Sequence, residues 1–125
     1  MTPILFVALS LAGGLGAATR FLVDGVVKAR IRSSYPIGVT VINVSGSFLL
    51  GLLTGLALGQ VLSHEWLLVL GTGFLGGYTT FSTASFETVR LLQTGRVGAG
   101  LLNGVGMLVA SVAVATLGLW LGSLA

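Results

Sequence analysis

The chain has 125 residues, of which 54% are hydrophobic and only 7% are charged. A soluble domain carries about 25% charged residues, and a chain this short cannot bury so much apolar surface in one globular core. Six Lys and Arg against three acidic residues form no basic stripe for nucleic acid, and the lack of cysteine excludes disulfides and thiolate metal sites. The composition predicts an integral membrane protein.

Four apolar segments are long enough to cross a bilayer, which takes about 20 residues as a helix. They cover residues 4–27, 37–62, 66–92 and 97–124. The first has no basic residue before it and is too long for the core of a signal peptide, so we expect it to remain as a span. We expect an all-α membrane protein with four transmembrane helices in a single domain, residues 1–125.

Glycines recur at four-residue intervals in two of these spans, as Gly51, Gly55 and Gly59 and as Gly100 and Gly104. Small residues at this spacing allow membrane helices to approach closely, so tight helix packing is predicted.

The third span contains four glycines followed by a run of β-branched and hydroxyl residues, which is a poor centre for a helix. We expect a break between Gly76 and Thr80. Non-helical backbone at membrane depth is tolerated where protein buries it or where it lines a cavity, and such breaks often bind ions. A packing kink is the alternative.

Basic residues flank only two of the linkers, at Lys28, Arg30, Arg32, Arg90 and Arg96. Both linkers lie on one side of a four-span chain, and the other side has neither Lys nor Arg. The positive-inside rule predicts cytoplasmic basic loops and external termini.

Several polar residues interrupt the spans. Asn43 lies in an apolar run, where its amide either joins helices or presents its N–H donors to an anion. In the third span Thr79, Ser82, Thr83 and Phe86 have the spacing of one helical face, and hydroxyls and phenyl edges both suit an anion. Two weaker candidates, Asn103 and Ser111, favour contacts between helices.

Ionisable residues in the spans are few and open to two interpretations. Arg20 could pair with Asp24 or attract an anion to a vestibule, and Glu87 could pair with Arg90 or Arg20. The single histidine, His64, lies in a linker. With no catalytic set of residues, the sequence does not indicate an enzyme.

Three motifs resemble the CrcB/Fluc fluoride channels. The stretch from Gly76 to Glu87 (GGYTTFSTASFE) is similar to the family's third-span signature, residues 43–48 (NVSGSF) to its second-span motif, and residues 13–20 to its first. The resemblance covers all four spans in order.

This resemblance implies an antiparallel dimer with two narrow pores, through which fluoride leaves the cell passively. It implies a structural Na⁺ at the dimer centre, held by the backbone carbonyls of Gly76 and Thr79. It also implies a pore lined by Asn43, Phe81, Ser82, Thr83 and Ser111, with Arg20 and Glu87 as vestibule or structural charges. The setting would be the plasma membrane of a prokaryote.

One position departs from the family pattern, since Ala84 stands where a second phenylalanine is usual. The one-sided loop charge also opposes the dual insertion that an antiparallel homodimer needs. We therefore expect pairing with a paralogous subunit rather than a second copy. Two alternatives remain: a small multidrug-type, proton-coupled transporter, and a non-conducting subunit of a heterodimeric channel.

Overall fold

The computed structural model describes residues 1–125, and every regular element is a helix. Three helices are long and apolar enough to cross a membrane. They are α1 (Pro3–Arg30), α2 (Ile37–Leu58) and a continuous helix over residues 97–123 that consists of α6 (Val97–Leu101), η2 (Leu102–Gly106) and α7 (Met107–Ser123). The expected all-helical chain with long apolar helices is confirmed.

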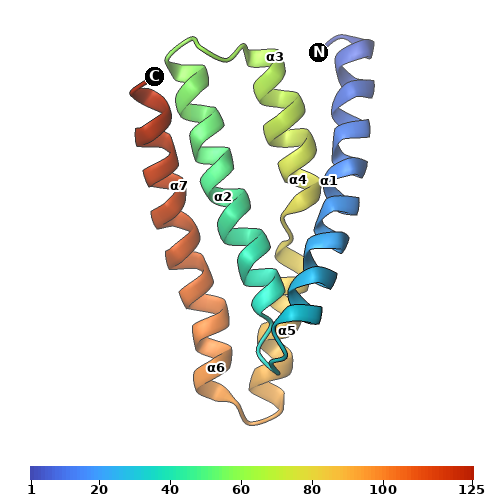
Figure 1. Cartoon of the computed structure of the whole chain (residues 1–125), viewed down its shortest axis with the longest axis vertical. Coiled ribbons are helices and arrows are strands. Elements are labelled where there is room, and N and C mark those ends of the chain that lie inside the picture. Colours follow the sequence, from blue (N-terminus) through green and yellow to red (C-terminus); the bar gives the residue numbers. More distant parts are fainter.

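The remaining predicted span is built from pieces. It begins with α3 (His64–Leu67) and η1 (Leu68–Leu75), continues through α4 (Gly76–Tyr78), and resumes after a gap as α5 (Phe81–Gln93). Figure 1 shows these pieces end to end beside α1 and α2. Two of the helical stretches, η1 and η2, have the wider turn of a π-helix, which the sequence did not predict.

The ends of several helices follow from local chemistry. Thr2 accepts a hydrogen bond of 3.1 Å from the Leu5 N–H, and Pro3 occupies the first position of α1. Ser63 caps α3 through the Trp66 N–H, at 3.3 Å. The turn after α5 contains Gly95 at φ 83°, a conformation that favours glycine.

Glycines bring two pairs of helices into backbone contact. Between α2 and α7, a Cβ added at Gly51 would overlap the carbonyl of Ala115, and one added at Gly118 would overlap that of Phe48. The predicted close packing of Gly51 and Gly55 is therefore confirmed, whereas Gly59 ends α2. Small residues give such contacts because van der Waals packing drives association in lipid.

Close packing at glycines also joins α1 to the broken helix, which runs from α3 to α5. A Cβ at Gly16 would overlap the carbonyl of Phe74, and one at Gly77 would overlap that of Gly13. In α6 and η2, Gly100 and Gly104 face the side chains of Leu92 and Thr88 on α5. The chain is thus held as close-packed helix pairs rather than around a thick apolar core.

Few residues are buried, only 20 of 125, and many large apolar side chains lie on the surface. Phe21 is 80% exposed and Phe6 is 62% exposed, for example. A soluble monomer rarely shows contiguous apolar surface on this scale. The outer faces of the helices are therefore suited to lipid or to another subunit.

Both termini and the turn before α3 lie at one end of the molecule, at the top of Figure 1. The linker between α1 and α2 and the turn between α5 and α6 lie at the opposite end. These two connections touch, because the Arg96 guanidinium donates to the Ser34 hydroxyl at 2.6 Å. Five of the six Lys and Arg residues lie in or beside these two connections, so they gather at this end of the bundle.

We predict that Gly118→Ala weakens the contact between α2 and α7 by about 1–3 kcal/mol, because the added methyl group would meet the backbone of Phe48 and Leu52. Thermal unfolding in detergent, followed by size-exclusion chromatography, measures the change. Gly25→Ala is the matched control, since nothing lies within 4 Å of the position of its Cβ. Equal melting temperatures for the two variants would contradict the prediction.

Candidate functional site

The candidate site is centred on the gap between α4 and α5. Thr79 (φ −79°, ψ 159°) and Thr80 (φ −145°, ψ 124°) are both extended. The Thr79 hydroxyl donates to the carbonyl of Leu75 at 2.9 Å, and Thr80 caps α5 by accepting from the Thr83 N–H at 3.1 Å. The break predicted between Gly76 and Thr80 is therefore present, at its C-terminal side.

Asn43, on α2, makes two hydrogen bonds to the extended backbone at this break. Its Oδ1 accepts from the Thr80 N–H at 2.8 Å, and its Nδ2 donates to the Thr80 carbonyl at 2.8 Å. The Thr80 N–H must donate to an oxygen, which fixes the orientation of the amide. We call this pair of hydrogen bonds the Asn43–Thr80 clamp. Both interpretations of Asn43 meet here, because the residue joins two helices and also faces a groove.

The break also deprives backbone carbonyls of their usual partners. In an uninterrupted helix the N–H of Thr80 would donate to the carbonyl of Gly76, and the N–H of Thr83 would donate to the carbonyl of Thr79. These donors instead bond Asn43 and the Thr80 hydroxyl. The carbonyl oxygens of Gly76 and Thr79 are left without helical donors, and oxygens of this kind suit a hard cation.

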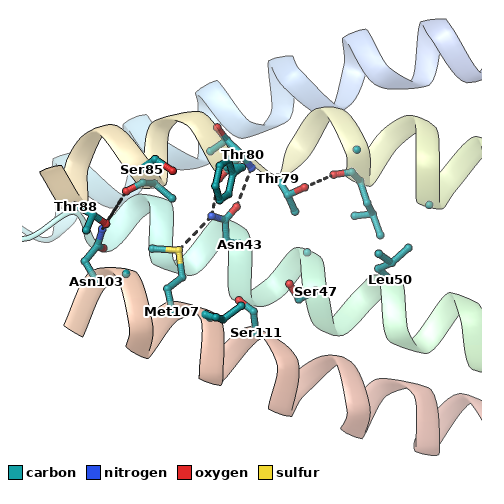
Figure 2. Close-up of a pocket in the computed structure, with 18 of the residues that line it drawn as sticks. Asn43, Ser47, Leu50, Thr79, Thr80, Ser85, Thr88, Asn103, Met107 and Ser111 are labelled. Atoms are coloured by element: carbon teal, nitrogen blue, oxygen red, sulfur yellow. Dashed lines mark hydrogen bonds between the residues drawn. The ribbon is translucent and has the colours of Figure 1, made fainter. Parts of the chain in front are cut away.

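A groove of about 750 Å³ runs between α2, the broken helix and α7 (Figure 2). Asn43, Ser47, Thr79, Thr80 and Ser111 are among its polar lining, and none of its lining residues is ionisable. Phe81 lines it too, and this side chain is 88% exposed. The groove thus offers neutral hydrogen-bonding groups between apolar walls.

The α5 face that lines the groove differs from the one expected. Phe81, Ala84, Ser85 and Thr88 line it at spacings of three and four, whereas Ser82, Thr83 and Phe86 do not. The interpretation that Thr79 shares a helical face with Ser82, Thr83 and Phe86 is wrong. The extended residues at the break reset the rotation of the helix, so a periodicity counted through Thr79 is out of phase.

The polar residues Ser85 and Thr88 were missed by that count. Thr88 donates to the carbonyl of Ala84 at 2.8 Å and accepts from Asn103 Nδ2 at 2.8 Å. Asn103 is 1% exposed and joins η2 to α5, as expected of a contact between helices. A helical count started at Phe81 would have found both α5 residues.

A second cavity of about 280 Å³ lies beside the break and is lined by Arg20, Asp24, Thr80 and Thr83, among others. Arg20 does not pair with Asp24, whose Oδ2 instead pairs with Lys28 Nζ at 2.9 Å. The structural pairing considered for Arg20 is therefore wrong, and its guanidinium forms no ion pair. Thr80 lines both cavities, so the break separates the groove from this charged pocket.

Glu87 makes one of the two contacts considered for it. Its Oε2 accepts from Arg90 Nη2 at 2.6 Å and from Arg90 Nε at 3.2 Å, within a single turn of α5. The carboxylate is thus neutralised locally and lines neither cavity.

Comparison with known proteins decides the family. The profile described as "CrcB-like protein, Camphor Resistance (CrcB)" matches residues 7–122. The chain belongs to the CrcB family. Its 125 residues are 58% identical to "Fluoride-specific ion channel FluC 1" of Leifsonia xyli subsp. xyli, covering all of this chain (100%) and 91% of that protein.

Two further CrcB relatives match over most of their length. "Fluoride-specific ion channel FluC 2" of Cutibacterium acnes is 51% identical, over 90% of this chain and 93% of its own. "Fluoride-specific ion channel FluC" of Geobacter sulfurreducens is 43% identical, over 100% of this chain and 97% of its own. The CrcB resemblance drawn from the three motifs is confirmed.

We predict that Asn43→Ala lowers the free energy of unfolding by about 2–4 kcal/mol, because Thr80 is 8% exposed and would lose partners for both its N–H and its carbonyl. Unfolding in detergent with increasing SDS measures the loss. Ser47→Ala, one turn along the same groove, is the control, since its hydroxyl bonds no other element. A loss below 0.5 kcal/mol for Asn43→Ala, on the order of a surface change, would refute the clamp.

Proposed function

We propose that this CrcB chain is a subunit of a fluoride-specific ion channel, which lets fluoride leave the cell down its gradient and so lowers cytoplasmic fluoride. The observation that carries the proposal is the uncharged groove beside Asn43, with its row of hydroxyl and amide groups. The names of relatives that match almost the whole chain support it.

The groove suits an anion that holds its water tightly. Such an ion dehydrates only if the pore supplies replacement hydrogen-bond donors, and hydroxyls and amides do so without a fixed charge. Asn43, Ser111 and the ring edge of Phe81 are the proposed pore contacts, together with Ser85. Thr88 lines the groove too, but its hydroxyl already donates to the Ala84 carbonyl and so offers the anion no donor. Phenyl edges are weakly positive, so an exposed Phe81 adds to this field.

Arg20 and Thr83 are assigned to the entrance of the proposed fluoride pore. Both line the charged pocket on the other side of Thr80, where an unpaired guanidinium would concentrate anions. Ser82 stays part of the proposed polar track, since its hydroxyl lies 3.4 Å from that of Thr80.

Passive conduction fits better than proton coupling. A small multidrug-type transporter needs a carboxylate deep in the membrane to exchange protons for cations. Asp24 is bonded to Lys28 near the end of α1, and Glu87 is bonded to Arg90. No carboxylate lines the groove, and the carboxylate in the second cavity, Asp24, is already paired with Lys28, so neither cavity favours the transporter alternative.

A fourth span and a dimer complete the proposal. The broken helix from α3 to α5 would cross the membrane as the fourth span. The groove is open on one side and Phe81 projects from it, so an antiparallel second subunit would close the pore. The free carbonyls of Gly76 and Thr79 would hold a structural Na⁺ at the centre of that dimer.

The partner is proposed to be a paralogue. Basic residues at one end of the bundle favour a single orientation in a prokaryotic plasma membrane, with the termini outside. Ala84 leaves one wall of the groove without a phenyl ring, so in a heterodimer the partner would complete the pore, or this chain would be its non-conducting half. The numbered names of the relatives are compatible with paralogous pairs.

We predict that Asn43→Asp reduces fluoride efflux from proteoliposomes by about a hundredfold or more, since a negative charge beside the anion costs about 4 kcal/mol at 4 Å and an effective dielectric constant of 20. A fluoride electrode measures efflux for the purified chain, alone and with a paralogous subunit. Gln60→Glu, the same chemical change in the turn after α2, is the control. Unchanged efflux for Asn43→Asp would overturn the assignment of the groove.

We predict that a tag at the C-terminus is reached only from outside intact cells, because five basic residues lie in or beside the α1–α2 and α5–α6 connections, at the other end of the bundle: Lys28, Arg30, Arg32, Arg90 and Arg96. Labelling of single introduced cysteines at Ser123 and Ser34, with a membrane-impermeant maleimide, measures the orientation. Equal labelling at both positions would mean dual insertion and would favour a homodimer.

A further inference from the structure

The two N–H groups of the Asn43 amide have unequal partners. One donates to the Thr80 carbonyl at 2.8 Å and belongs to the clamp. The other donates to the sulfur of Met107 at 3.2 Å. A thioether is a weak acceptor, much poorer than an amide oxygen or an anion. This second N–H is therefore satisfied only weakly.

Met107 lies where it can be displaced. It is the first residue of α7, is 7% exposed, and lines the groove together with Asn43. Figure 2 shows its sulfur reaching across the groove toward the amide. The methionine side chain is unbranched and adapts to irregular spaces at low cost. Its side chain therefore changes rotamer more easily than a branched one, at a position that borders the open volume of the groove.

We propose that Met107 is a displaceable placeholder for the permeant anion: its sulfur occupies the free Asn43 N–H when the pore is empty and yields that donor when fluoride arrives. The inference rests on the proposed channel function and names a residue that sets the affinity of its site. The clamp N–H is not exchanged, because the same amide also accepts from Thr80.

This arrangement limits how tightly the anion is held. An N–H left without any partner in a low-dielectric groove is costly, and an anion that relieved this cost would bind strongly and leave slowly. The weak bond to sulfur removes part of that gain. Conduction requires a site strong enough to admit the ion and weak enough to release it, and Met107 supplies the second condition.

The test is Met107→Leu, which keeps the volume of the side chain and removes the acceptor. With no competing acceptor, the fluoride concentration that half-saturates efflux should fall by about threefold to tenfold, the equivalent of one modest hydrogen bond. Leu53→Met, at a partly buried position of α2 outside the groove, controls for an exchange of Leu and Met. Met107→Ile serves as a second variant if the leucine form fails to fold.

A readout without transport separates this inference from the channel function. The chain has only two asparagines, Asn43 and Asn103, so [¹⁵N]asparagine labelling gives two side-chain amide nitrogens in detergent, each with two proton signals. Thr88→Val identifies the signal of Asn103, its hydrogen-bond partner. Met107→Leu should change the chemical shift of one Asn43 amide proton. Sodium fluoride should then change that shift at a lower concentration than in the unaltered chain.

Each outcome is decisive. The placeholder is supported if the Asn43 signal responds at a fluoride concentration at least threefold lower in Met107→Leu than in the unaltered chain, while Leu53→Met responds as the unaltered chain does. Half-saturation and amide response within twofold of the unaltered chain would overturn it while leaving the channel intact. No fluoride response from the Asn43 amide in any variant would overturn it as well, and absent efflux with or without a paralogue would refute the proposed function.

Discussion

Every backbone polar group at membrane depth must find a partner, and the rest of the structure depends on how this rule is met at Thr79 and Thr80. The Asn43–Thr80 clamp pairs one N–H and one carbonyl that the gap between α4 and α5 exposes. Three consequences follow from that clamp. It fixes the rotation of α5, it takes the N–H that would otherwise donate to the carbonyl of Gly76, and it places an amide donor at the wall of a groove.

The groove exists because helices pack closely within certain pairs, whereas the space between one pair and the next is less completely filled. Glycine contacts join α2 to α7 and α1 to the first half of the broken helix. These contacts bring the backbones of each pair together, while the space between α2, α5 and α7 stays open as the groove. A core of large side chains would have closed that space, so the glycine content serves the site as much as the stability of the fold.

Composition and span length predicted the helical class, because apolar runs of this length have few other solutions. The glycine and hydroxyl run located the break within a few residues, and the spacing of Gly51 and Gly55 predicted a real contact. Ser85 and Thr88 were left off the predicted face of the third span because helical periodicity fails across extended residues. The partner of Asp24 was misjudged because Arg20 and Lys28 are both four residues away. Nothing in the sequence indicated that Met107 contacts Asn43, since that bond joins residues far apart in the chain.

Two features of the chain would place opposite demands on a second subunit. One is the open side of the groove, and the other is the position of all but one of the basic residues at one end of the bundle. Closing the groove symmetrically by an antiparallel copy would place these basic residues on both sides of the membrane, against the bias that orients insertion. A parallel copy would satisfy the bias, but its break would not face this one across an antiparallel two-fold axis. The proposed paralogue, of the same fold and with the opposite charge bias, would satisfy both demands.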